Sequence, residues 1–252
     1  MEGGLPGIDW RLVLGTSLLV WALAQTRRFV HRDAAVIPTR LVGQNQLALW
    51  LYALLMLPGT VLHELSHAGA ATLMMVEVHA FDLSPSRDEE SITLGTVETD
   101  RPDILRRTVV GLAPLFIGTV AVLVISALAF DLNQVYAALV AGKWPDALHI
   151  LTASIAHWWD WLAVYLVFAI SASMFPSPDD LPRGPRIAVS LLPILLAGGV
   201  DLGASFWPWL VNATNTAFRW LVLIFSFTLV IDLPILLFLT ASTEAIEKQF
   251  PR

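Results

Sequence analysis

Residues 46–76 read QLALWLYALLMLPGTVLHELSHAGAATLMMV. The segment is long and apolar enough for a helix that crosses a bilayer, which needs about 20 mostly apolar residues. It nevertheless contains His63, Glu64 and His67. An ionisable side chain in hydrocarbon costs about 2.5–3.5 kcal/mol on insertion scales, so three of them close together indicate a functional site inside the helix rather than ordinary packing.

The spacing of the two histidines is typical of a metal site. Residues four apart share one face of a helix, so His63 and His67 can direct two imidazoles at one ion. Glu64 lies about 100° further round the helix, where it can reach a water molecule without binding the ion itself. In the HExxH pattern these positions supply two zinc ligands and a general base. We therefore expect Zn²⁺ as cofactor, and because the chain has no cysteine, its third ligand has to be His, Asp or Glu.

The composition of the whole chain predicts an all-α polytopic membrane protein. Hydrophobic residues make up 56% and charged residues only 14% of the 252 residues, whereas globular domains carry about 25% charged residues. We expect an integral, multi-pass protein in the lipid bilayer with about six transmembrane helices. The net charge of −6 gives no basic footprint, so we expect no nucleic-acid partner. The candidate spans are residues 10–26, 46–76, 108–130, 147–173, 187–206 and 217–241.

Two connecting segments are long enough to carry structure of their own. Residues 27–45 contain four arginines and are interpreted as a surface loop. Residues 77–107 contain two stretches that alternate apolar and polar side chains, VEVHAFDL and SITLGTVETD, joined by SPSRDEE. Alternation around a turn-rich joint predicts a small β-hairpin after the HELSH helix, with an irregular polar loop as the alternative. The arrangement of Lys and Arg leaves the orientation in the membrane and the oligomeric state open.

The strongest candidate for the third ligand lies in SASMFPSPDDLPRG, residues 171–184. Three prolines prevent regular helix through most of this segment. A non-helical backbone could therefore bring the carboxylate of Asp179 or Asp180 toward the HELSH helix. In the alternative interpretation Ser177 is the N-cap of a following helix, Pro178 is its first residue, and the two aspartates merely favour the helix dipole.

Three motifs together resemble the intramembrane site-2 protease superfamily of zinc metalloproteases. They are HELSH, the paired prolines and following aspartate of SMFPSPDDL, and GLAPLFIG at 111–118. The resemblance covers about 46–200. Two features depart from the family pattern: Ser173 stands where Asn is usual, and the Leu-Asp-Gly ending is absent.

The resemblance implies a zinc endopeptidase that cleaves transmembrane segments of membrane proteins. It implies that His63, His67 and Asp180 hold the zinc, with Asp179 as the alternative to Asp180. Glu64 would activate the water. SMFPSPDDL is similar to a bacterial and archaeal branch of the family, which implies a prokaryotic cell membrane.

The resemblance also divides the chain. Residues 1–45 would form a first transmembrane helix and basic loop, 46–200 the metalloprotease core, and 201–252 a C-terminal transmembrane helix and tail. The hairpin within 77–100 would bind an extended substrate, as exposed strand edges do.

A proline and two glycines in the GLAPLFIG segment predict how its helix packs. Pro114 would kink the helix, while Gly111 and Gly118 would admit close neighbours. In the last span, Asp232 precedes Pro234 by two residues. A carboxylate inside a membrane is a functional candidate, so Asp232 is interpreted as a partner of a ligating histidine, as a contact to another helix, or as part of a wet kink.

Two functions other than proteolysis use the same motif. One is a catalytically silent receptor or scaffold that binds a metal, and the other is a metal transporter. Glu64 favours a hydrolase over both, because pure binding does not need a general base beside the ligands.

Overall fold

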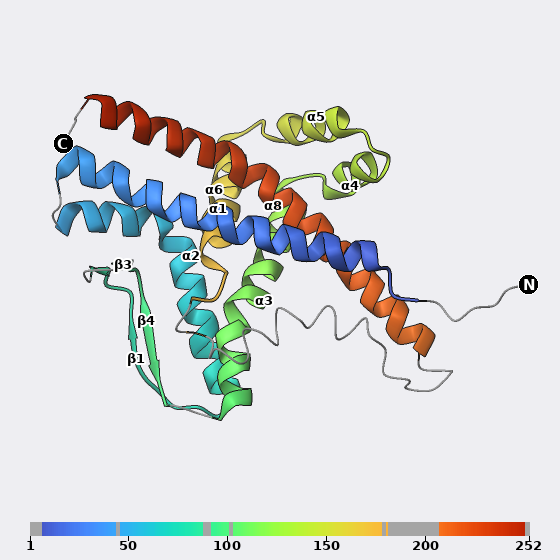
Figure 1. Cartoon of the computed structure of the whole chain (residues 1–252), viewed down its shortest axis with the longest axis horizontal. Coiled ribbons are helices and arrows are strands. Elements are labelled where there is room, and N and C mark those ends of the chain that lie inside the picture. Colours follow the sequence, from blue (N-terminus) through green and yellow to red (C-terminus); the bar gives the residue numbers. More distant parts are fainter. Residues whose placement is uncertain are drawn as a thin grey trace, which may run out of the picture.

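The computed structural model describes residues 7–43, 46–87, 92–100, 103–177, 180 and 207–249. It is mainly helical, with a small antiparallel sheet between the second and third helices (Figure 1). The helices are α1 (Trp10–Val42), α2 (Gln46–Leu73), α3 (Ile104–Ala129), α4 (Leu132–Val140), α5 (Trp144–Ser154), α6 (Trp158–Ser173) and α8 (Trp207–Gln249). The strands are β1 (Val78–Asp82), β2 (Ser86–Arg87), β3 (Ile92–Thr93) and β4 (Thr96–Thr99).

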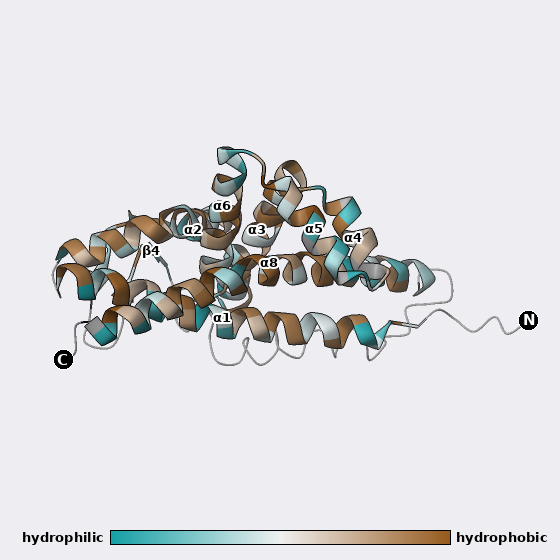
Figure 2. Ribbon diagram, turned by 90° about the horizontal axis from the view of Figure 1, so that it is seen from above, coloured by the Kyte–Doolittle hydropathy of each residue, from teal (hydrophilic) through white to brown (hydrophobic). Residues whose placement is uncertain are grey.

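Three of the described helices are long and apolar enough to cross a membrane: α2, α3 and most of α8. The pair α5 and α6 makes a fourth candidate if it counts as one span bent by 118°. The ribbons of these helices are coloured largely as hydrophobic residues (Figure 2), and several of their large apolar side chains are exposed, as expected for contact with lipid. Leu128 on α3 is 84% exposed and Phe238 on α8 is 70% exposed. The chain is thus mainly helical and has three candidate membrane-spanning helices, which is consistent with a membrane protein, while the expected number of six spans is not reached by the described helices.

The single helix predicted over 147–173 is wrong, because α5 and α6 are separate helices with a sharp bend between them. The Asp160 carboxylate accepts hydrogen bonds from the backbone N–H groups of Ala156 and His157, at 2.9 and 2.7 Å. These bonds satisfy backbone donors at the start of α6 and so allow a new helix to begin there. The span predicted over 187–206 lies outside the described residues.

The surface loop predicted over 27–45 is also wrong, because α1 continues as a helix to Val42. One face of this segment packs inward through Val30, Asp33 and Ala34, each 1% exposed. The Asp33 carboxylate accepts a hydrogen bond from Thr240 of α8 at 2.7 Å. The basic half of α1 is therefore held against α8, and the two helices run side by side (Figure 1).

The predicted hairpin is confirmed. β1 pairs antiparallel with β4, with Val78 opposite Thr99 and Asp82 opposite Thr96. β2 pairs antiparallel with β3 nearer the joint. The hairpin lies alongside the second half of α2 (Figure 1), which is the half that carries HELSH.

The helices α2 and α6 cross closely just before the HELSH motif. Gly59 lies at this crossing, since a Cβ atom there would be 1.9 Å from the carbonyl oxygen of Ala169. Pro58, within α2, has no N–H to donate to the carbonyl of Leu54. The Tyr165 hydroxyl of α6 lies 3.4 Å from that carbonyl oxygen and donates to the Leu55 carbonyl at 3.0 Å. The Tyr165 hydroxyl of α6 thus binds backbone carbonyl groups of α2 next to the proline.

Candidate metal centre

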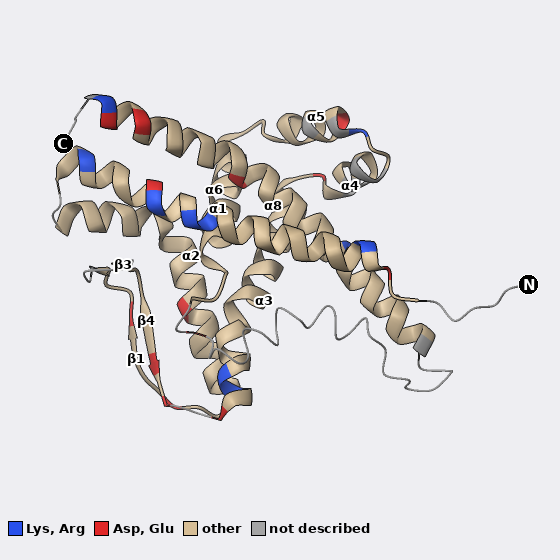
Figure 3. Ribbon diagram, viewed as in Figure 1, with Lys and Arg blue, Asp and Glu red and all other residues tan. Residues whose placement is uncertain are grey.

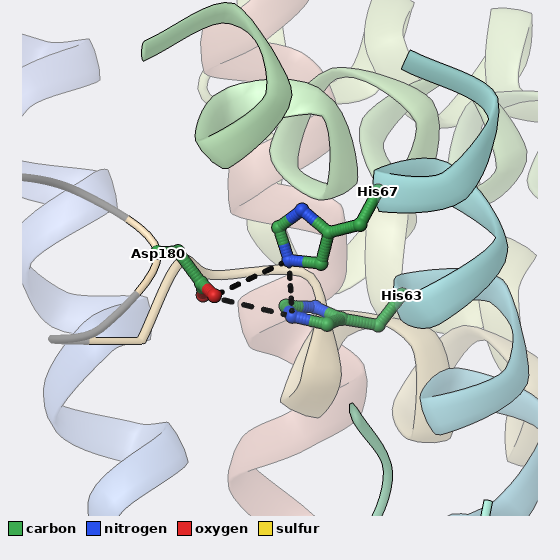
Figure 4. A group of neighbouring side chains, drawn as sticks. All are labelled: His63, His67 and Asp180. Atoms are coloured by element: carbon green, nitrogen blue, oxygen red, sulfur yellow. Dashed lines mark hydrogen bonds and ion pairs between the residues drawn. The ribbon is translucent and has the colours of Figure 1, made fainter. Parts of the chain in front are cut away.

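The side chains of His63, His67 and Asp180 converge on one point (Figure 4). The Nε2 atoms of the two histidines are 3.1 Å apart. Asp180 Oδ1 lies 3.4 Å from His67 Nε2, and Asp180 Oδ2 lies 3.7 Å from His63 Nε2. The structure therefore brings together the three residues that the sequence predicted as ligands, from α2 and from the segment after α6.

The donor set and its dimensions fit a zinc ion. Two ligand atoms at 2.0–2.1 Å from a tetrahedral zinc are separated by about 3.3 Å, close to the separations found here. Two imidazoles and one carboxylate also leave one position for water, as catalytic zinc sites do. Asp179, the alternative ligand, lies outside the described residues.

The backbone of α3 sets the protonation of His67. His67 Nδ1 lies 2.9 Å from the Val110 carbonyl oxygen. A carbonyl only accepts, so Nδ1 carries the proton and Nε2 presents its lone pair to the site. The Val110 carbonyl is available because the residue four positions later is Pro114, which has no N–H to donate to it. His63 Nδ1, in contrast, is buried without a hydrogen-bond partner in the described part of the chain.

Asp180 is oriented by Ser177. The backbone N–H of Ser177 donates to Asp180 Oδ2, and the backbone N–H of Asp180 lies 3.3 Å from Ser177 Oγ. These are reciprocal bonds of the capping-box type. They orient the Asp180 carboxylate toward the two histidines, while the helix that Ser177 would cap in the alternative interpretation lies outside the described residues.

The segment that leads to Asp180 packs closely against α3. A Cβ atom at Gly118 would lie 2.5 Å from the Cβ atom of Met174. The expectation that Gly118 admits a close neighbour is thus met, and the neighbour is the first residue after α6.

Glu64 lies beside the three candidate ligands and is 7% exposed. With them it lines a cavity of about 1300 Å³. The hairpin closes one side of this cavity: residues 92–100 line it, and a Cβ atom at Gly95 would lie 2.9 Å from Cγ of Glu64. The returning arm of the hairpin therefore rests directly on the expected general base, and only glycine permits that approach.

No family model, curated protein or solved structure matches this chain. Its function therefore has to be inferred from the chemistry of the cavity.

A second group of possible ligands lies at the exposed base of the hairpin. It consists of Glu77, His79 and Asp100. His79 Nε2 lies 2.8 Å from Asp100 Oδ1. This hydrogen bond and the negative charge of Asp100 raise the pKa of the His79 imidazole above its usual value. Acidic residues lie at several positions along the hairpin (Figure 3).

Asp232 is separate from the metal centre. It is 4% exposed, and its two carboxylate oxygens lie within hydrogen-bond distance of the Ser171 hydroxyl oxygen, at 3.0 and 2.8 Å. Of the three interpretations of Asp232, this contact supports pairing with another helix, since Ser171 belongs to α6.

Sequence reasoning missed several polar residues that line the cavity, among them Arg27, His31 and Tyr52. Arg27 and His31 lie four apart on α1, so a helical interpretation of 27–42 would have placed them on one face. The assignment of residues 27–45 to a surface loop is the reason that Arg27 and His31 were not recognised as neighbours.

Proposed function

We propose that this protein is a zinc-dependent intramembrane endopeptidase that cleaves transmembrane segments of other membrane proteins. The observation that carries the proposal is the convergence of His63, His67 and Asp180 beside the buried carboxyl group of Glu64. The resemblance of the motifs to the site-2 protease superfamily supports the same conclusion. A multi-pass location in a prokaryotic cell membrane belongs to this proposal.

In the proposed reaction His63, His67 and Asp180 would hold the zinc. Zinc, when bound, lowers the pKa of a coordinated water to about 7 and polarises a carbonyl group. Glu64 takes a proton from the attacking water as its oxygen bonds to the scissile carbonyl carbon. Glu64 then donates that proton to the amide nitrogen as the C–N bond breaks, so that it ends in its starting state.

The hairpin provides a way to hold the substrate. In a two-stranded sheet each strand has one edge without a strand partner, and β4, which pairs with β1, lines the cavity. An extended peptide can add to such an edge through main-chain hydrogen bonds. A transmembrane segment would have to unwind locally to do so, since helical peptide bonds are engaged within the helix.

The test uses the full chain reconstituted in nanodiscs with a panel of single-span membrane proteins. New N-termini are detected by mass spectrometry. We expect the wild type to cleave at least one member, and Glu64→Gln to lose activity by at least about 10²-fold, as expected for loss of a general base. Glu244→Gln, an exposed carboxylate on α8, is the matched control and should cleave normally.

Equal cleavage by the wild type and Glu64→Gln would refute the proposal. Stoichiometric zinc binding without cleavage of any panel member would instead favour a metal-binding scaffold or a transporter.

A further inference from the structure

The end of α6 controls where Asp180 lies. α6 stops at Ser173, and the chain reaches Asp180 only seven residues later. The last carbonyl groups of a helix have no donor within the helix. How those carbonyls are bound therefore decides the direction in which the chain leaves α6.

Two side chains of α1 bind carbonyls on either side of this exit. His31 Nε2 lies 2.9 Å from the Ala172 carbonyl oxygen, within the last turn of α6. Arg27 Nη1 donates to the Phe175 carbonyl oxygen at 2.6 Å, two residues past the end of the helix. A cationic donor is also favourable at a helix C-terminus, where the helix dipole is negative.

His31 is itself held by the helix that carries HELSH. Its Nδ1 atom lies 2.5 Å from the Tyr52 hydroxyl of α2. Because the Ala172 carbonyl can only accept, a neutral His31 carries its proton on Nε2, and the Tyr52 hydroxyl donates to Nδ1. Tyr52, which is 4% exposed, thus connects α2 to the end of α6 through one imidazole ring.

We propose that Arg27 and His31 are positioning residues that hold the exit from α6 in register with the HELSH helix, so that Asp180 reaches the third ligand position. The inference rests on the proposed function in taking His63, His67 and Asp180 as zinc ligands. It adds that α1, which contributes no ligand to the described centre, determines the affinity of the site for the metal.

The experiment measures zinc affinity in the full chain by competition with a chromophoric chelator, without substrate. Replacing a residue that orients a metal ligand typically costs 10–100-fold in affinity, so we expect Arg27→Gln and His31→Leu to weaken zinc binding by about 10-fold or more. His31→Gln should recover part of the loss, because its amide N–H can donate to Ala172. Arg28→Gln removes the same charge from the next, exposed residue and should bind zinc as the wild type does.

The absorption spectrum of the Co²⁺-substituted protein reports the ligand set directly. Arg27→Gln should change the spectrum in the same direction as Asp180→Asn. If Arg27 acts through Asp180, the double variant should bind zinc no more weakly than Asp180→Asn alone. Fully additive losses would instead indicate a general loss of folding and would overturn the inference.

The outcomes separate this inference from the proposed function. Wild-type zinc affinity and cobalt spectra in both Arg27→Gln and His31→Leu would overturn the inference even if the protein cleaves its substrate. A wild type that binds zinc tightly but cleaves nothing would remove the peptidase and leave the positioning role intact. A wild type without stoichiometric zinc would remove both.

Discussion

The Nδ1 atom of His67 donates to the carbonyl of Val110 at 2.9 Å, and that carbonyl is free because Pro114 follows four residues later. A proline inside a helix normally only weakens it. Here the missing backbone N–H leaves an acceptor for a candidate metal ligand. Pro114 thus fixes which nitrogen of His67 faces the candidate metal centre.

Replacing Pro114 with alanine should weaken zinc binding. The new backbone N–H would compete with His67 Nδ1 for the Val110 carbonyl, and we expect a loss of about 10-fold in zinc affinity. Alanine is the better helix former, so helix content should not fall. Chelator competition measures the affinity and circular dichroism the helix content. Pro38→Ala in α1 is the control, and equal zinc affinity in both variants and the wild type would contradict the role of Pro114.

Local patterns in the sequence were sufficient for the histidines and the hairpin. The spacing of His63 and His67 follows from helix geometry, and the alternation in 77–100 follows from strand geometry. The sequence left Asp179 as an alternative to Asp180 for the third ligand. The choice depends on the path of the backbone after α6, where prolines prevent regular helix and no periodic pattern applies.

Other features depend on contacts between distant residues. The face of α1 that carries Val30 and Ala34 has helical spacing, but Asp33 is buried beside Thr240, a partner 207 residues away. The break between α5 and α6 contains neither proline nor glycine. The new helix starts there because the Asp160 carboxylate accepts hydrogen bonds from the backbone N–H groups of Ala156 and His157. Sequence patterning alone therefore merged these two helices.

Replacing Gly59 with alanine should destabilise the whole bundle. The new methyl group would lie 1.9 Å from the backbone oxygen of Ala169, so α2 and α6 would have to move apart. Overpacking of this kind costs about 1–3 kcal/mol in the free energy of unfolding. Denaturant titration in detergent measures it. Gly15→Ala, whose nearest contact would be an ordinary 3.7 Å, is the control, and equal stability of the two variants would refute the close crossing.

The pairing of His79 with Asp100 should depend on pH in a defined direction. Asp100 raises the pKa of His79 in the folded protein. The ion pair therefore contributes its full stabilisation of the folded state at pH below the unfolded-state pKa of His79, about 6.5. This stabilisation is lost as the pH rises through the higher folded-state pKa. Histidine NMR titration should show the His79 pKa falling in Asp100→Asn and unchanged in Asp131→Asn. A His79 pKa that is the same in all three proteins would exclude the contact.

Replacing Gly95 with alanine should separate catalysis from metal binding. The added Cβ would lie 2.9 Å from Cγ of Glu64 and 3.2 Å from Cγ2 of Thr60, so the proposed general base or the hairpin arm has to move. Displacement of a reacting group by about 1 Å can cost about 10²-fold in rate. The three atoms nearest to this methyl group belong to Glu64, Thr60 and Asp82 and not to a candidate ligand, so zinc affinity should stay at the wild-type value. Cleavage in nanodiscs and chelator competition measure the two quantities.

Gly69→Ala is the matched control for this experiment. It lies on α2 two residues after His67, and a Cβ atom there meets nothing within 4 Å. It should leave both cleavage and zinc binding unchanged. Normal cleavage by Gly95→Ala would mean that the hairpin arm does not constrain Glu64, while a parallel loss of zinc would mean that the arm supports the ligands rather than the base.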